Sequence, residues 1–227
     1  TPADYNVLTA SNNVNISGTV AALNWNEIGL ATNTEYGRQA RGVNGPTGFP
    51  TALTPSTSWY THAAQPGTPA QPFTQVNFTS VTLNWLANGN PPATLYAAQI
   101  STDAFATVNG SSRTYDTSTV FSGLGANTTY HFQVRAINHG GTETGFISLG
   151  STVTLAAPPV AAAFSGMGTD RIQAGWTSAN PSGTLYELRA STDANFSGVA
   201  TSSLTYNLFV SSTGLNVNTT HYFQVRA

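Results

Sequence analysis

The sequence predicts an all-β protein made of tandem β-sandwich modules, the first and last of them incomplete. Three observations lead to this prediction. Sequence blocks recur at intervals of about ninety residues, hydrophobic residues alternate with a period of two, and turn-forming Asn, Gly and Pro residues separate the alternating runs. A repeat of about ninety residues is the size of one small sandwich module. Long runs with a helical period are not found in the sequence.

The clearest repeated block is a Gly-Leu turn followed by a strand. It reads GLATNTEYGRQARGVN from Gly29, GLGANTTYHFQVRAIN from Gly123 and GLNVNTTHYFQVRA from Gly214. A second block reads SVTLNW, ending at Trp85, and RIQAGW, ending at Trp176. A third reads TLYAAQISTDAF and TLYELRASTDANF, with a diverged DYNVLTAS near the start. Three blocks in a constant order indicate an internal duplication rather than chance similarity.

Each block that ends in tryptophan predicts a strand with one buried face. In the middle repeat Val81, Leu83 and Trp85 alternate with the polar Thr82 and Asn84. Successive side chains of a strand point to opposite faces, so this pattern places the apolar set on a core and the polar set in water. Asn-Gly and Asn-Pro dipeptides between the runs indicate turns.

Several of these residues resemble the fibronectin type III pattern over essentially the whole chain: a Trp closing strand B, a Tyr opening strand C, and a Leu six residues before the Tyr of strand F. The resemblance implies tandem immunoglobulin-like β-sandwiches, as in bacterial-type extracellular or surface repeat proteins. In that family the Leu and Tyr form a tyrosine corner, in which the phenol hydroxyl bonds to nearby backbone. The structural core positions that it implies are Trp85, Trp176, Tyr96, Tyr186, Leu30, Tyr36, Leu124, Tyr130 and Leu215.

The resemblance breaks at two positions. In the third repeat the residue six positions after Leu215 is His221, where the pattern has tyrosine. This puts the tyrosine corner of the third module in doubt. In the first repeat Arg38 takes the inward position that Phe132 and Phe223 hold in the others. Two explanations stay open for this arginine: the first module packs differently, or the side chain extends through the missing strands to water.

The alignment of Tyr5 with Tyr96 and Tyr186 places the start of the chain at strand C. The predicted modules are therefore residues 1–66, lacking strands A and B, residues 67–156, complete, and residues 157–227, lacking strand G. Two explanations compete: a fragment of a longer array, or completion of each sandwich by strands from neighbouring chains. Strand counting favours the fragment, because both outer modules keep the middle strands.

Composition excludes several classes of partner. Charged residues make up 7% of the chain and the net charge is −2, so no basic field is available for nucleic acid or an anionic membrane. No apolar run is long enough to span a bilayer. The absence of cysteine excludes disulfides and thiolate metal sites.

Catalytic motifs are missing as well, so we expect no catalytic residue, no cofactor, no metal and no enzymatic activity. The repeated Asp103 and Asp193 suggest either a calcium site or a capped turn. The turn is favoured, because calcium needs six or more oxygen ligands and each motif offers one carboxylate. The histidines are interpreted as structural; they are His62, His131, His139 and His221.

Asn-x-Ser/Thr triplets make glycosylation a candidate modification. In a chain rich in Asn, Ser and Thr such triplets also arise by accident, and the recurrence at Asn127 and Asn218 is better explained by turn chemistry. The candidate positions are Asn15, Asn77, Asn109, Asn127, Asn195 and Asn218.

Trp59 and Tyr60 are adjacent in the last predicted strand of the first module, so alternation directs one ring inward and the other outward. Packing between modules is the favoured use, because the linker AAQPGTPAQP follows closely; stacking on a sugar is the alternative. A second proline-containing linker, AAPPVAAA, follows the middle module. The two proline-containing linkers predict that successive modules form a semi-rigid rod.

The leading hypothesis is a non-enzymatic, extracellular or cell-surface structural or adhesive repeat segment. Its expected partners are neighbouring modules, like chains and surface glycans. The alternative is a spacer or weak carbohydrate-binding region of a larger secreted polysaccharide-degrading enzyme. A third hypothesis places the modules in a surface filament.

Overall fold

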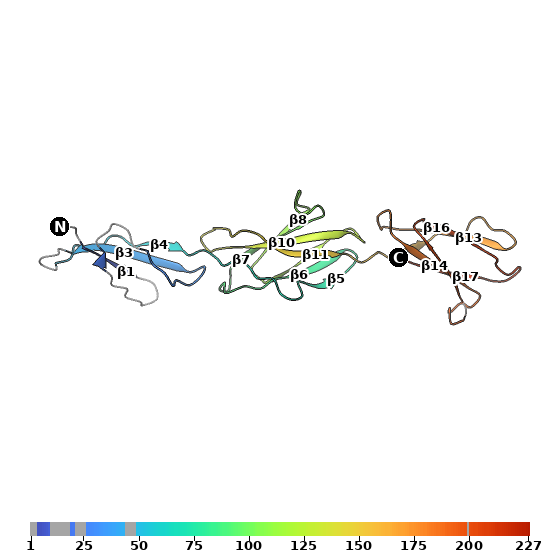
Figure 1. Cartoon of the computed structure of the whole chain (residues 1–227), viewed down its shortest axis with the longest axis horizontal. Coiled ribbons are helices and arrows are strands. Elements are labelled where there is room, and N and C mark those ends of the chain that lie inside the picture. The colour runs from blue at the N-terminus through green and yellow to red at the C-terminus, as the bar shows by residue number, and fades with distance from the viewer. Residues whose placement is uncertain (1–3, 10–18, 21–25, 44–48, 199) are drawn as a thin grey trace.

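The computed structural model describes residues 4–9, 19–20, 26–43, 49–198 and 200–227 of the chain. Within these residues the secondary structure consists of strands and turns, with no helix. Three groups of strands follow one another along an elongated molecule (Figure 1). The all-β tandem sandwich fold predicted from the repeats is confirmed.

The first module contributes a single described sheet. The strand order is β2-β1-β3-β4, and each pair of neighbouring strands is antiparallel. The strands are β1 (Asp4–Thr9), β2 (Thr19–Val20), β3 (Glu35–Val43) and β4 (Thr57–Tyr60).

The middle module is a sandwich of two antiparallel sheets with the orders β5-β6-β9 and β11-β10-β7-β8. The first sheet contains β5 (Phe73–Val76), β6 (Ser80–Asn84) and β9 (Ser118–Ser122). The second contains β7 (Leu95–Ser101), β8 (Gly110–Thr114), β10 (Thr129–Ile137) and β11 (Ile147–Val153).

The third module repeats this plan with the orders β12-β13-β16 and β15-β14-β17. The first sheet contains β12 (Val160–Ala161), β13 (Arg171–Thr177) and β16 (Phe209–Thr213). The second contains β14 (Tyr186–Ser191), β15 (Thr201–Thr205) and β17 (Tyr222–Arg226).

Strand register agrees with the sequence alignment of the modules. Tyr5 of β1 lies opposite Gly42 of β3, and Tyr96 of β7 lies opposite Ala136 of β10. The strands β1, β7 and β14 therefore occupy equivalent places in their sheets. Because a slip of one residue would exchange the two faces of a strand, this register sets which side chains enter the core.

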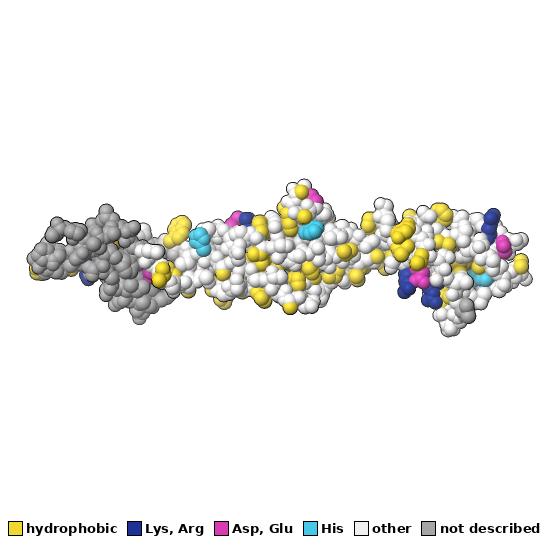
Figure 2. All heavy atoms as spheres, viewed as in Figure 1, with side chains coloured by type: hydrophobic (Ala, Val, Ile, Leu, Met, Phe, Trp, Pro, Cys, Tyr) yellow, Lys and Arg dark blue, Asp and Glu magenta, His cyan; other side chains and the backbone are white. Residues whose placement is uncertain are grey.

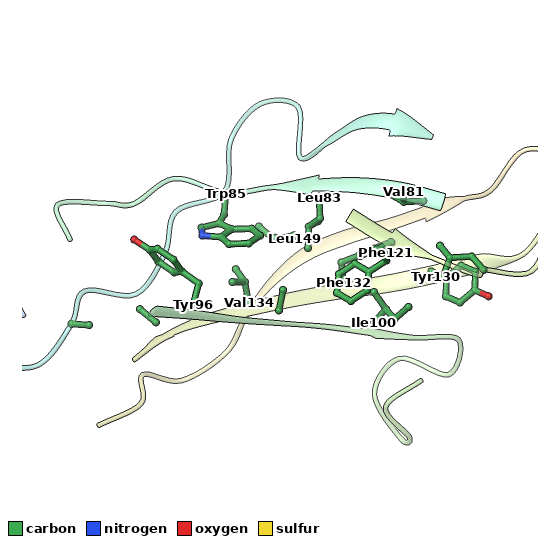
Figure 3. Packing of buried hydrophobic residues seen from close by; sticks show 14 residues of the cluster. Val81, Leu83, Trp85, Tyr96, Ile100, Phe121, Tyr130, Phe132, Val134 and Leu149 are labelled. Carbon is green, nitrogen blue, oxygen red and sulfur yellow. The ribbon is translucent and has the colours of Figure 1, made fainter. Parts of the chain in front are cut away.

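The core of the middle module follows the alternation of β6. Val81 and Leu83 are fully buried and Trp85 is 3% exposed, and Trp85 lies above Tyr96 and Val134 of the facing sheet (Figure 3). The Trp85 ring centroid lies 5.6 Å from that of Tyr96, a distance at which aromatic pairs add stabilisation beyond area burial. The third module repeats the pair with Trp176 and Tyr186, again 5.6 Å apart.

The remaining expected core residues differ in burial from one module to another. Leu124 and Tyr130 of the middle module are buried, whereas Leu30, Tyr36 and Leu215 are half-buried. The tyrosine corner is present twice: the Tyr36 hydroxyl accepts from the Ala31 N–H and the Tyr130 hydroxyl from the Gly125 N–H, each at 2.9 Å. In the third module a ring nitrogen of His221 lies 3.4 Å from the Asn216 carbonyl oxygen instead.

Arg38 is accommodated by a charge partner. Its guanidinium bonds to the Glu27 carboxylate at 2.6 Å and stacks over the Tyr36 ring at 4.8 Å. Both charged side chains are largely covered, at 22% and 13% exposure. The first module is therefore packed differently from the others at this position, which is the first of the two explanations that the sequence left open.

Candidate functional site: the junctions between modules

The turn that precedes β3, β10 and β17 carries an asparagine in each module. Asn33, Asn127 and Asn218 have φ values of 47°, 45° and 53°. This left-handed conformation is uncommon outside glycine, and asparagine tolerates it better than most residues. The turn thus directs an amide side chain away from the end of its own module.

At the first junction this amide bonds to the middle module twice. The Asn33 Nδ2 donates to the Thr94 Oγ1 at 2.7 Å, and its Oδ1 accepts from the His139 N–H at 2.6 Å. Asn33 and Thr94 are each 1% exposed. Buried polar groups need such partners, because an unsatisfied one costs about 1–3 kcal/mol.

The second junction repeats the first of these bonds. The Asn127 Nδ2 donates to the Thr184 Oγ1 at 2.9 Å. Thr94 and Thr184 begin the same repeated block, Thr-Leu-Tyr, in the middle and third modules. Equivalent residues therefore join equivalent positions at both junctions.

Each linker is held by a second asparagine. The Asn90 side chain accepts from the Ala64 N–H and donates to the Ala64 carbonyl, both at 2.8 Å. Asn180 makes the same pair of bonds to Ala157, at 2.6 and 2.9 Å. These are the asparagines of the repeated Asn-Pro turns, so one amide replaces the backbone partner that the linker residue lacks.

A threonine ties the start of each linker to the preceding turn. The Thr61 Oγ1 accepts from the Thr34 N–H at 2.9 Å and donates to the Ala31 carbonyl at 2.6 Å. We call three features together the junction unit. At the first junction they are the bond between Asn33 and Thr94, the bonds from Asn90 to the linker residue Ala64, and the bonds from Thr61 to the preceding turn.

The second junction has the same threonine contacts. The Thr154 Oγ1 accepts from the Thr128 N–H at 3.0 Å and donates to the Gly125 carbonyl at 2.6 Å. The junction unit is therefore present twice, residue for residue. It can fix the angle between modules without any charged group.

Trp59 and Tyr60, the predicted contact pair at the end of the first module, lie in different environments. Tyr60 meets the His139 ring edge-on, with centroids 5.8 Å apart, while Trp59 is 72% exposed. The middle module also reaches back through Asn138, whose Nδ2 donates to the Thr61 carbonyl at 3.0 Å. Tyr60 therefore packs between modules, and Trp59 faces water.

Sequence reasoning missed the junction unit. It assigned the repeated Asn127 and Asn218 to turn chemistry, which the left-handed φ values support, but it gave their amides no partner. The recurrence of Asn-Thr in one block together with Asn-Pro and Thr-Leu-Tyr in another was the available signal.

The Ser-Thr-Asp motifs form capped turns. The Asp103 Oδ1 accepts from the Ser101 hydroxyl and the Thr107 N–H, and its Oδ2 accepts from the Thr107 hydroxyl. The Ser101 bond, followed by those from Thr107, lowers the pKa of Asp103 to about 2. Asp193 repeats the cap with Ser197, which lowers its pKa too. The described residues hold no cluster of three or more His, Asp or Glu that suits a metal ion.

The candidate glycosylation residues differ in accessibility. Asn15 lies outside the described residues, and Asn127 is half-buried with its amide committed to the second junction. The exposed ones are Asn77, Asn109, Asn195 and Asn218.

The surface of the rod has few charges. Figure 2 shows a few small groups of acidic and basic side chains, separated by wide uncharged surface, over the middle and third modules. No helix long and apolar enough to cross a membrane exists within the described part of the chain.

Comparison with known proteins identifies the architecture. The family model for the fibronectin type III domain matches residues 67–148. The middle module is a fibronectin type III domain. The other modules repeat its sequence blocks and strand register.

The chain is also similar to a solved two-domain fibronectin type III segment from chicken tenascin. It is 13% identical, with a TM-score of 0.47, and the match covers 71% of this chain and 90% of that one. The FN1–FN3 domains of chicken CNTN1 are 15% identical, with a TM-score of 0.30, and the match covers 98% and 84%. A search of curated proteins found no match.

Proposed function

We propose that the chain is a non-enzymatic structural or adhesive segment of an extracellular or cell-surface protein, in which fibronectin type III modules serve as spacers. The single observation that carries this proposal is the junction unit, which joins successive modules through equivalent residues. A repeated junction gives each added module the same rotation and rise, as a rod, fibre or filament requires.

The chemistry of the junction suits such a role. Its bonds join neutral amides, hydroxyls and backbone groups, so salt does not screen them as it screens exposed ion pairs. Each buried bond contributes about 0.5–1.5 kcal/mol, and several act at each junction. The proline-containing linkers add stiffness.

The test is to remove the amides that join the modules while keeping the turns. Glycine adopts positive φ without strain, so Asn33→Gly with Asn127→Gly removes the bonds to Thr94 and Thr184 but preserves the left-handed turns. Pulsed electron paramagnetic resonance between spin labels on neighbouring modules should then give a broader distribution of label-to-label distances.

Asn218→Gly is the matched control, because this turn lies at the far end of the third module and its amide is exposed. We expect the control to leave both inter-module distributions unchanged. Distributions as broad in the parent chain as in the double variant would contradict a stiff spacer.

Trp59 supports a second candidate function, a carbohydrate-binding accessory region of a larger secreted polysaccharide-degrading enzyme. Its ring is 72% exposed, and an exposed indole stacks well on the apolar face of a sugar. Affinity electrophoresis in polysaccharide gels, with Trp59→Ala beside the parent chain, tests it. Retardation that disappears in the variant would favour this function; equal mobility in every gel would eliminate it.

A further inference from the structure

An exposed tyrosine recurs in the turn that joins the two sheets of the middle module and of the third module. Tyr115 follows β8 and is 66% exposed, and Tyr206 follows β15 and is 67% exposed. Each precedes the leucine of the repeated Gly-Leu turn by nine residues, so the two tyrosines are equivalent. Tyr115 has this exposure in a module whose strands β5 to β11 are all described, so the exposure does not depend on either end of the chain.

A threonine hydroxyl fixes the start of this turn in both modules. The Thr114 Oγ1 accepts from the Asp116 N–H, and the Thr205 Oγ1 accepts from the Asn207 N–H, each at 3.0 Å. A side-chain bond to the backbone two residues on stabilises a turn. In each module the tyrosine is the residue between the two partners of this bond.

The core tryptophan fixes the end of the same turn. The Trp85 N–H donates to the Thr117 carbonyl, and the Trp176 N–H donates to the Leu208 carbonyl, each at 3.0 Å. Both tryptophans are 3% exposed, so each turn is tied to the core of its module. A turn that is held at both ends loses little conformational freedom when a ligand binds to it.

The residues around the tyrosine differ between the two modules, whereas the tyrosine and the threonine before it are the same. The middle module has Arg113, Thr117 and Ser118 where the third has Leu204, Leu208 and Phe209. A largely exposed ring contributes little to the core, so packing does not account for its presence in both modules. The ring is available to a ligand in each of them.

A planar side chain with a free oxygen follows each ring. Asp116 follows Tyr115, and Asn207 follows Tyr206. Both side chains are exposed, and within the described part of the chain only their backbone N–H groups have hydrogen-bond partners. A carboxylate and an amide share an oxygen acceptor but not a charge. The group that suits both is therefore a neutral donor such as a hydroxyl, and not a cation.

One aromatic ring beside a hydrogen-bond acceptor suits a sugar. A pyranose combines an apolar C–H face, which packs on an aromatic ring, with hydroxyl groups at its rim. A protein partner needs a larger surface, because stable interfaces bury about 800 Å² on each side. In the middle module the neighbours of the ring are polar or charged, so the apolar surface there is that of a single ring.

We propose that the Tyr115 and Tyr206 turns are two binding sites for a neutral polysaccharide. The ring stacks on a sugar face, and Asp116 or Asn207 accepts hydrogen bonds from the sugar hydroxyls. Leu208 and Phe209 are 44% and 49% exposed and enlarge the apolar surface of the Tyr206 turn, so the third module has the tighter site. The proposal rests on the carbohydrate-binding candidate function above, but it does not involve Trp59.

The experiment is affinity electrophoresis of the whole chain in gels that contain hydroxyethylcellulose, galactomannan or dextran as neutral probes. We expect at least one of them to retard the parent chain. Tyr206→Ala should weaken the apparent affinity by about tenfold, as the loss of an aromatic contact does in other interfaces. Tyr115→Ala should weaken it less, because it removes the weaker site. The double variant should migrate as it does without polysaccharide, with the urea midpoint of the parent chain.

Variants of Asp116 in the Tyr206→Ala chain test the class of ligand, because only the middle site then remains. Asp116→Asn gives this turn the side chain of the third module, so we expect the retardation to stay within about twofold. Asp116→Ala removes the acceptor and should abolish the residual retardation. Equal losses in Asp116→Asn and Asp116→Ala would overturn the neutral ligand, because binding would then depend on the negative charge.

Trp59→Ala separates this proposal from the function on which it rests. Retardation that disappears in Trp59→Ala but is unchanged in the tyrosine double variant would overturn the tyrosine sites and leave carbohydrate binding to Trp59. A parent chain that no polysaccharide retards would overturn carbohydrate binding as a whole. The spacer function is decided separately, by the distances between spin labels.

Discussion

A single ring distinguishes the third module from the other two at the residue scale. In the middle module the Tyr130 hydroxyl accepts from the N–H of Gly125, two residues after the Gly of the repeated turn. His221 cannot repeat this bond in the same way, because its ring nitrogen lies against the Asn216 carbonyl. The departure from the family pattern thus has a direct structural consequence: one turn N–H loses its side-chain acceptor.

Restoring the ring should stabilise the third module. We expect His221→Tyr to raise its free energy of unfolding by about 0.5–1.5 kcal/mol, the net value of one hydrogen bond, in urea titrations. His221→Phe is the control, since it supplies the ring without the hydroxyl. Equal stabilisation by both variants would show that ring packing, and not the corner bond, is responsible.

One buried and one exposed tryptophan provide a paired test of the core. Trp85→Ala removes a ring that is 3% exposed and leaves a cavity, so we expect a loss of about 3–5 kcal/mol from the middle module. Trp59→Ala removes a ring that is 72% exposed and should change stability by less than about 0.5 kcal/mol. Chemical denaturation measures both, and similar losses would contradict the register of β6.

The Asp103 cap predicts a pH dependence. Its folded pKa of about 2 lies below the usual value, so the stability it contributes is present above about pH 4 and is lost as the pH falls toward 2. We expect Asp103→Asn to unfold at a lower temperature than the parent at pH 7, with the two midpoints converging near pH 2. A constant difference between the midpoints across this range would exclude the carboxylate as the cause.

At the scale of elements, the linkers are irregular segments that belong to no strand. Asn90 and Asn180 each supply both a donor and an acceptor to one alanine of the linker, as a partner strand would. Such satisfaction matters because backbone groups that are shielded from water and left unpaired are costly. The Asn-Pro turns therefore serve the linker as well as their own module.

Removing one of these amides should loosen one linker only. We expect Asn90→Ala to speed hydrogen exchange at the Ala64 amide by about tenfold while leaving the Ala157 amide unchanged, and Asn180→Ala to do the reverse. Thr82→Ala, on the outer face of β6, is the control and should affect neither linker, because the Thr82 hydroxyl bonds to Gln75 of β5. Exchange unaltered at both alanines would mean that the linkers are held by other contacts.

Elements and their register were predictable from the sequence, whereas the contacts between modules were not. Alternation in β6 and the repeated tyrosines carry their own signal, because burial follows a period of two along one strand. Asn33 and Thr94 lie 61 residues apart and belong to different modules, so neither repeat alone reveals their bond. Arg38 is a different case: the sequence shows a charged residue at an inward position of the strand, but it does not show that Glu27 is its partner.

At the scale of the whole molecule, the modules carry cores of different size. The middle module and Ala63 of its preceding linker form a buried cluster of fourteen hydrophobic residues, and the described third module has one of four. Burial stabilises by about 25 cal/mol per Å² of apolar surface, so the smaller cluster gives the third module less stability. Ion pairs compensate little, because exposed pairs such as Arg226 with Glu187 contribute about 0–1 kcal/mol.

This imbalance predicts that the chain unfolds in separate steps. We expect peptides from β13 to lose protection against hydrogen exchange at lower urea concentration than peptides from β6, because few bonds couple the two modules at the second junction. Asn127→Gly should widen the interval by removing one of those bonds, and Asn218→Gly should leave it unchanged. A single concerted loss of protection in both strands would mean that the junction transmits more stability than its hydrogen bonds account for.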